Sequence, residues 1–382
     1  MKPTATHSKA TTLDIAIPGL AALALAISTV CMARPDADGQ RAASAKPTQQ
    51  STLRAAVDAD GTVHVDGLTL PPSRYSSAEA KADLINRAKA PPAPTLSSDI
   101  KVLREFFGKY NDALAERMKQ LYSVRIDHKI IGGVRTEVIV PTQGVSERNT
   151  QRVLINLHGG GFQWGEGSGG EVESVPIASV GRIKVITVAY RLGPEHRFPA
   201  ASEDVAAVYK ALLRDYDPAH IGIYGCSAGG ILTAQSIAWF DKVGLPMPGA
   251  IGTFCGSASP FSGDSIHIAT ALSGESRAEL QEMTWRYFAG ARATDPLVFP
   301  VNSPQLLARF PPTLLMAGSR DFALSSLFNT QAQLEQAGVE TNLHVWDGLR
   351  HAFFIDPDVP ESKQAYEIIV RFFDRHLKTG PK

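Results

Sequence analysis

The sequence has few cysteines and no excess of charge of either sign. Its three cysteines, Cys31, Cys226 and Cys255, show no C-x-x-C spacing, which argues against a disulfide framework or a zinc knuckle. Lys and Arg number 38 and Asp and Glu number 38, so the formal net charge is zero. Such a balance lacks the basic surface that nucleic acids select and any polybasic arm for a membrane, so neither partner is expected.

The composition that remains is that of a folded globular protein. Hydrophobic residues make up 44% of the chain and charged residues 20%, which supplies enough apolar side chains for a sizeable core. A length of 382 residues suits one large α/β domain with additions, or two ordinary domains.

The N-terminus has the order of a secretory signal. Basic residues precede an apolar run over residues 13–30, and small residues follow it. We expect a signal-like segment over residues 1–33 and a linker over residues 34–73. The predicted location is therefore periplasmic or secreted, with a membrane-anchored form as the alternative. The run is short and interrupted, so the mature chain is not expected to insert stably in a membrane.

The remainder alternates between helical and strand patterns. Two helices, 78–90 and 100–121, flank a proline-rich break, and a hairpin with a Gly-Gly turn follows over residues 124–140. Near-continuous apolar strands separated by helices predict an α/β fold with a mostly parallel, roughly eight-stranded sheet buried on both faces. The predicted strands after the hairpin are 153–157, 184–189, 221–224, 251–255, 313–317 and 341–345. The predicted helices are 201–216, 227–240, 324–337 and 361–377.

Ser227 lies in a G-x-S-x-G motif, Gly225-Cys226-Ser227-Ala228-Gly229. The motif follows a predicted strand and opens a predicted helix, which is the setting of a nucleophile elbow. Flanking glycines suit a sharp turn whose backbones approach closely. The alternative is an ordinary helix N-cap serine. A near match around Ser276 lacks the second glycine and has no preceding strand.

A second motif, His158-Gly159-Gly160-Gly161, also follows a predicted strand. Glycine amides unshielded by side chains can converge on one point and stabilise an oxyanion. A phosphate-binding loop is the competing interpretation, but no Gly-Lys-Ser/Thr follows the glycines.

Ser227 would need a base and a group that orients it. His351 and Asp321 each come soon after a predicted strand, at the edge where α/β sheets bind their ligands. The order Ser, Asp, His is that of α/β hydrolases. Asp347, Asp356 and Asp358 are rival acids. The structural alternatives are a helix N-cap for Asp321 and a surface loop position for His351.

With these motifs, the chain resembles the hormone-sensitive-lipase-like carboxylesterases of the α/β-hydrolase superfamily. The matching segments are 158–162, 190–196, 198–201, 225–230, 295–296 and 310–313. The resemblance implies an α/β-hydrolase domain over residues 122–382 and a helical cap from residues 74–121 and an insertion at about 260–300. It also implies an oxyanion hole from the backbone amides of Gly160, Gly161 and Ala228.

Two positions depart from the family pattern: Cys226 precedes the nucleophile, and Phe322 follows the acid where proline is common. Cys226 and Cys255 are expected to be buried small residues. Glu166, Glu171 and Glu173 are expected on a solvated face, with substrate selection at the pocket mouth as the minority alternative. The Pro-Glu-His run that contains His196 is expected to brace a loop.

The sequence thus predicts a serine carboxylesterase acting on small to medium acyl esters or lactones, with Ser227 as nucleophile and no metal or organic cofactor. An amidase or peptidase on the same fold, or a non-catalytic ligand-binding relative, is the alternative. Phe106, Phe107, Phe162 and Trp164 are candidates for the wall of the substrate pocket. The oligomeric state is not predicted.

Overall fold

The computed structural model describes residues 55–58, 63–65, 69–273 and 276–380. The chain divides into two compact units, residues 1–69 and residues 70–382. In the first unit, β1 (Ala55–Val57) pairs with β2 (Val63–Val65) in an antiparallel sheet, within the stretch predicted as a linker. The signal-like segment predicted for residues 1–33 lies outside the described residues.

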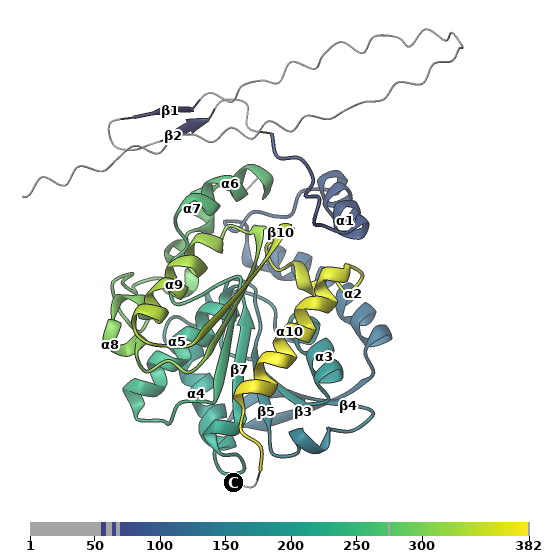
Figure 1. The fold of residues 1–382 in the computed structure, drawn as a ribbon, viewed down its shortest axis with the longest axis vertical. Helices are drawn as coiled ribbons and strands as arrows, with labels where there is room; N and C mark the ends of the chain where they lie inside the picture. The colour runs from purple at the N-terminus through teal and green to yellow at the C-terminus, as the bar shows by residue number, and fades with distance from the viewer. Residues whose placement is uncertain (1–54, 59–62, 66–68, 274–275, 381–382) are drawn as a thin grey trace, which may run out of the picture. The chain divides into compact units, whose positions relative to one another are not determined.

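The second unit is built on the central sheet seen in Figure 1. This sheet has eight strands in the order β10-β9-β8-β7-β5-β6-β4-β3. Within this sheet β4 alone runs opposite to the other strands, since it pairs antiparallel with both β3 and β6, so the sheet is mostly parallel, as predicted. The strands are β3 (Val124–Ile131), β4 (Val134–Pro141), β5 (Val153–Leu157), β6 (Lys184–Val188), β7 (Ile221–Cys226), β8 (Ala250–Phe254), β9 (Thr313–Arg320) and β10 (Thr341–Arg350).

Helices cover both faces of this sheet (Figure 1). The helices are α1 (Ala78–Lys89), α2 (Ile100–Leu121), α3 (Ser168–Gly181), α4 (Ala200–Leu212), α5 (Ala228–Val243), α6 (Asp264–Ser273), α7 (Arg277–Leu280), α8 (Pro304–Leu307), α9 (Leu324–Gln336) and α10 (Pro360–His376). One hydrophobic cluster joins the sheet to α4, α5 and α9, and a second joins it to α3 and α10. Among the described helices, none combines the length and apolarity needed to cross a bilayer.

The central strands explain the two separate cores. Every residue of β5 is buried, and successive side chains along it point to opposite faces. Accordingly Val153, Ile155 and Leu157 enter one cluster, whereas Leu154 enters the other. Because β5, β7, β8, β9 and β10 are parallel, their carboxyl ends meet along one edge, where loops from distant parts of the sequence come together.

The elements predicted from the sequence are present, with small differences at their ends. β9 and β10 extend further than predicted, to Arg320 and Arg350. As a result, Asp321 and His351 lie directly after the two strands. Ser276, the near match to the nucleophile motif, caps α7: its hydroxyl accepts from the amide of Glu279 in a capping box.

Helix α3 is one of the elements that the sequence did not predict. Its first turn contains Gly169 and Gly170, and Pro176 lies inside it, so local propensity argues against a helix. A Cβ at Gly170 would lie 2.3 Å from the Thr187 side chain, which shows that close packing selects glycine there. The expectation of a solvated acidic face is wrong for Glu173, which is buried at 6% exposure. Tertiary contacts outweigh propensity in this segment.

Arg152 fastens the C-terminal end of α10 to the sheet. It is 2% exposed, and it donates to the carbonyl oxygens of Leu377 and Lys378 and, at 3.2 Å, to the carboxylate of Asp374. These carbonyls follow the last turn of the helix, where backbone acceptors lack helical partners. A buried guanidinium therefore replaces water as the donor.

We predict that Arg152→Ala lowers the free energy of unfolding by about 2–4 kcal/mol, because buried acceptors lose their donor. Arg148→Ala is the matched control: Arg148 reaches the same Asp374 at 3.4 Å with 58% of its side chain exposed, and its loss should cost less than about 1 kcal/mol. Urea unfolding of both variants measures the difference. Equal losses would contradict the assignment.

Candidate active site

Ser227 lies at the turn between β7 and α5 in a strained backbone conformation. Its φ is 56° and its ψ −120°, values that non-glycine residues rarely adopt. The Ser227 amide donates to the carbonyl of Phe254 at 2.7 Å. Although Ser227 occupies the N-cap position of α5, its side chain makes no capping hydrogen bond. Ser227 is half-buried at the end of β7, and its hydroxyl is not used to cap the helix.

The glycines of the motif permit a very close approach of two strand ends. A Cβ at Gly225 would lie 2.3 Å from the carbonyl oxygen of Leu157, and a Cβ at Gly229 would lie 1.8 Å from it. At Gly230 an added Cβ would lie 2.7 Å from the carbonyl oxygen of Gly256. No side chain fits at any of these positions. The end of β5 is thus pressed against the turn that carries Ser227.

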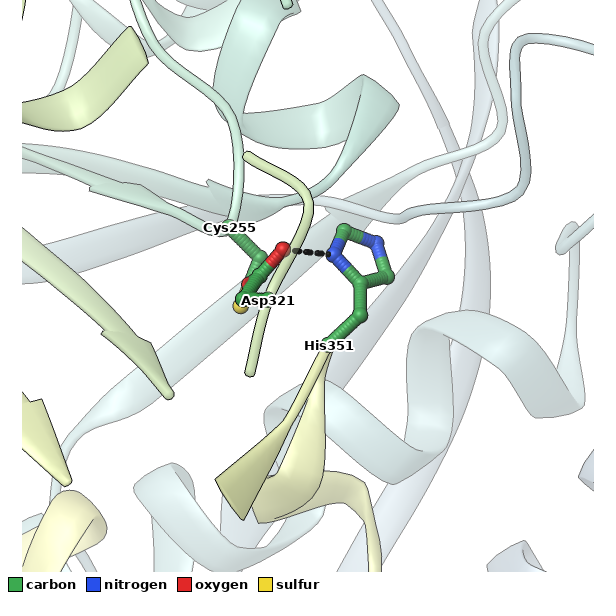
Figure 2. A group of neighbouring side chains, drawn as sticks. All are labelled: Cys255, Asp321 and His351. Atoms are coloured by element: carbon green, nitrogen blue, oxygen red, sulfur yellow. Dashed lines mark hydrogen bonds and ion pairs between the residues drawn. The ribbon is translucent and has the colours of Figure 1, made fainter. Parts of the chain in front are cut away.

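His351 and Asp321 form a hydrogen-bonded pair at the same edge (Figure 2). The Nδ1 atom of His351 lies 2.7 Å from Oδ1 of Asp321, which also accepts from the amide of Ala323 at 2.8 Å. Asp321 has 0% exposure, whereas the His351 side chain is 23% exposed. A buried carboxylate on Nδ1 fixes the ring so that its other nitrogen is directed away from Asp321.

The rival acids have other partners. The Asp347 carboxylate accepts from the hydroxyls of Ser73 and Ser319, and these bonds hold its pKa below the usual range. Asp358 pairs with Arg117 at 2.7 Å, and Asp356 lies 3.8 Å from Arg87. Asp321 is not the N-cap of α9, because Ala323 holds that position. His351 directly follows β10 and is bonded to Asp321.

The loop after β5 brings its glycines beside Ser227. A Cβ at Gly159 would lie 3.5 Å from the Cβ of Ser227. Gly160 and Gly161 have positive φ values of 111° and 56°, which glycine adopts without strain. Ala228 is the first residue of α5, so its amide has no partner within the helix. Gly159 thus adjoins the nucleophile turn, Gly160 and Gly161 follow it in the same loop, and Ala228 directly follows Ser227.

Two buried side chains fix the orientation of this loop. Nδ1 of His158 lies 2.7 Å from the carbonyl oxygen of Gly159, and the hydroxyl of Tyr190 donates to the carbonyl of His158 at 2.6 Å. Burial lowers the pKa of His158 to about 4, so the ring is neutral and Nδ1 carries the proton that is donated. The His158 ring also stacks on Tyr190, with centroids 4.3 Å apart.

Glu173 reaches the same loop from α3. One carboxyl oxygen accepts from the amide of Gly159 at 2.8 Å and the other from the side-chain amide of Asn156 at 3.1 Å. Burial raises the pKa of Glu173 to about 8, although these bonds and one from the amide of Cys226 oppose the shift. The side chain is therefore mostly protonated and neutral at pH 7.

Cys226 and Cys255 are free and buried, as predicted. Burial raises the pKa of Cys226 to about 11 and that of Cys255 well above its usual value, so neither forms the thiolate that nucleophilic chemistry requires. Cys255, Asp321 and His351 are the one group within the described residues whose donor atoms could meet at a metal ion (Figure 2). The bond from Asp321 already occupies Nδ1 of His351, which argues against a metal centre.

Phe322 contacts the site, and the sequence analysis did not predict this contact. Its ring stacks on that of His351 with centroids 4.1 Å apart, and its edge meets Phe261 at 5.0 Å. The aromatic face is suited to stabilise a positive charge on the imidazole. The sequence signal was present, because Phe322 stands where the family often has proline.

The four predicted pocket residues occupy different environments. Phe107 of α2 stacks on Trp164 with centroids 4.5 Å apart, and the Trp164 ring lies beside Gly161. Phe106 meets Phe107 edge-on at 5.2 Å and is 36% exposed. Phe162 is fully buried against Tyr287, at 4.4 Å between centroids. Phe107 and Trp164 thus cover the glycine loop, whereas Phe162 belongs to the core beneath it.

An arginine connects α2 to the glycine loop. Arg104 donates to the carbonyls of Gln163 and Gly193 and forms a two-pronged ion pair with Glu195 at 2.7 Å. Glu195 therefore contributes the bracing expected of the Pro-Glu-His run, while the side chain of His196 is exposed.

Two cavities of about 670 and 650 Å³ lie behind the glycine loop, and none of Ser227, Asp321 and His351 lines either of them. The larger one contains Arg104, Arg135 and Arg191, each already paired with a carboxylate. These charges are therefore satisfied within the protein.

Comparisons with known proteins agree with this fold. Residues 154–355, more than half of the chain, match a family described as having the alpha/beta hydrolase fold. An acetyl-hydrolase of Streptomyces hygroscopicus is 28% identical over 62% of this chain and 79% of its own length. An esterase of Acinetobacter venetianus is 27% identical over 68% and 86%. A solved esterase of the bacterial hormone-sensitive lipase family is 26% identical, with a TM-score of 0.67 over 79% of this chain and 99% of its own.

Proposed function

Since the chain belongs to the alpha/beta hydrolase family and is a carboxylic ester hydrolase similar to the hormone-sensitive-lipase-like esterases, we propose that it works through a Ser227–His351–Asp321 triad and an acyl-enzyme. The observation that carries the proposal is the meeting, at one sheet edge, of a strained serine and a buried Asp–His pair bonded at 2.7 Å.

In the first half-reaction, Ser227 Oγ attacks the ester carbonyl carbon while its proton passes to Nε2 of His351. Asp321 holds the proton on Nδ1 and stabilises the imidazolium that forms. The tetrahedral intermediate collapses, the bond to the alcohol oxygen breaks, and His351 returns the proton to the leaving alcohol. Water then repeats the sequence on the acyl-enzyme, releasing the acid and restoring Ser227.

The oxyanion of each tetrahedral intermediate is proposed to accept from the amides of Gly160, Gly161 and Ala228. This proposal is supported by the closeness of the glycine loop to the Ser227 turn and by the free position of the Ala228 amide at the start of α5. Phe322 adds an aromatic face to His351, which favours the imidazolium during turnover.

The proposed substrates are small to medium acyl esters or lactones. Support comes from the aromatic cover that Phe107 and Trp164 form over the glycine loop, since an enclosed apolar wall limits acyl length and excludes water. A chain-length series of p-nitrophenyl esters with a set of lactones tests the substrate class.

Ser227→Ala should lower kcat by about 10⁴- to 10⁶-fold, because the nucleophile is lost while the small change preserves the fold. Ser276→Ala is the control, since Ser276 belongs to the near match but caps α7; its activity should stay within about twofold while stability falls by about 1 kcal/mol. A fluorophosphonate should label wild type at Ser227. More than a few per cent of residual turnover in Ser227→Ala would refute the triad.

Asp321→Asn should lower kcat by about 10⁴-fold, because the amide would present His351 in the wrong tautomer. Asp347→Asn, four residues before His351, is the matched exchange and should have little effect, because the Asp347 carboxylate accepts from the hydroxyls of Ser73 and Ser319 and not from His351. Steady-state kinetics on both variants decide the question. A severe loss in Asp347→Asn with a mild one in Asp321→Asn would reverse the assignment.

Phe107→Ala should shift the preferred ester toward longer acyl chains, because it removes the ring stacked on Trp164. We expect the ratio of kcat/KM for octanoate over butyrate esters to rise on the order of tenfold. Phe328→Ala, which removes a 49% exposed ring on α9, serves as the control. Unchanged chain-length profiles in both variants would show that Phe107 does not shape the acyl site.

A further inference from the structure

We propose that Glu173 is a positioning residue for the reaction: through its bond to the Gly159 amide, it holds the oxyanion loop against the nucleophile turn. This inference rests on the proposed triad mechanism and extends it to a side chain that does not touch substrate. Glu173 is the buried acid of α3, and Gly159 lies between its carboxyl group and Ser227.

Side chains fix the orientation of two consecutive peptides, His158–Gly159 and Gly159–Gly160. In a trans peptide the C=O and the N–H point in opposite directions. The carbonyl of His158 is held by Tyr190, and the amide on the other side of that peptide, Gly159 N–H, is held by Glu173. The next carbonyl, of Gly159, is bonded to His158 Nδ1, so the Gly160 N–H points away from the histidine ring.

Glu173 connects the oxyanion loop to two strands of the sheet. Its two oxygens bind the loop at Gly159 and the end of β5 at Asn156. Its own backbone carbonyl accepts from the hydroxyl of Tyr224 on β7 at 3.2 Å. One residue of α3 therefore joins the oxyanion loop to the strand before it and to the strand that ends at Ser227. Loss of its acceptor would leave a buried N–H unpaired.

The ionisable groups around Glu173 are neutral. Within the described residues, Glu173 forms no ion pair, and the ionisable groups that face it are Tyr190, Tyr224 and Cys226, with His158 in the loop. Burial raises the pKa of both tyrosines well above the usual value and that of Cys226 to about 11, and lowers that of His158 to about 4. All four are thus neutral near pH 8, where Glu173 itself titrates.

The protonation state of Glu173 then matters for the reaction. The neutral acid orients the loop without opposing the negative charge that develops on the substrate oxygen. Above pH 8 the ionised carboxylate places a like charge behind the oxyanion loop, which disfavours the tetrahedral intermediate. Wild-type kcat should therefore fall as the pH rises through about 8.

The experiment compares Glu173→Leu, Glu173→Gln and Glu171→Leu in the full chain, with active sites counted by fluorophosphonate labelling. Glu173→Leu removes the acceptor and should lower kcat about 10- to 100-fold with KM nearly unchanged, less than the loss of an oxyanion donor itself. Glu173→Gln restores a neutral acceptor of the same shape and should recover kcat at pH 7 to within about fivefold of wild type. It should also abolish the fall in kcat above pH 8.

Glu171→Leu is the control, because Glu171 lies two residues away on the same helix and pairs with Lys119 at 3.1 Å. Its kcat and pH profile should match wild type. Tyr190→Phe provides a second route if Glu173→Leu folds poorly: it releases the other side of the same peptide and should lower kcat without altering the alkaline profile.

Two results would overturn the proposal: Glu173→Leu with the kcat of Glu171→Leu, or a Glu173→Gln enzyme that keeps the wild-type alkaline fall. If either occurs while Ser227→Ala is inactive, only the role of Glu173 is refuted. If Ser227→Ala retains turnover, the triad mechanism is refuted instead.

Discussion

The near-contact between the ends of β5 and β7 is the constraint on which the site depends. Backbone atoms of Leu157 and of the Ser227 turn approach so closely that a Cβ at Gly229 would lie 1.8 Å from a carbonyl oxygen. Because no side chains separate these segments, the glycine loop and the nucleophile turn share one small space. Backbone packing therefore sets the position of the amides in the glycine loop. The surrounding side chains set the direction in which these amides point.

Burial controls charge throughout this region. His158 and Glu173 lie on the side of the loop away from the triad, and burial keeps both neutral at pH 7. Asp321 is also buried, but it shares its oxygen with His351 and the Ala323 amide. The stable ion pairs of the unit, such as Arg104 with Glu195, lie further out. The two side chains that support the loop from behind, His158 and Glu173, thus carry no charge at rest that would oppose the proposed oxyanion.

Much of the fold could be predicted from the sequence because its signals are local. Strands such as β5 are near-continuous apolar runs, and the motifs at the strand ends predicted Ser227, Asp321 and His351 as the site. Helix α3 could not be predicted, since two glycines and Pro176 hide a segment that packing makes helical. Glu173 was misassigned for the same reason: adjacent acids resemble a solvated face until the tertiary structure shows which one is enclosed.

Arg104 links helix α2 to two loops beside the site. A single guanidinium on α2 binds the carbonyl of Gln163, next to Trp164 and the glycine loop, and the carbonyl of Gly193 in the following loop. Helix α2 therefore bonds to the segment that follows the glycine loop, and Glu173 of α3 bonds to the start of the same loop. Because one side chain bonds both carbonyls, a displacement of α2 would also displace the backbone next to Trp164 and the glycine loop.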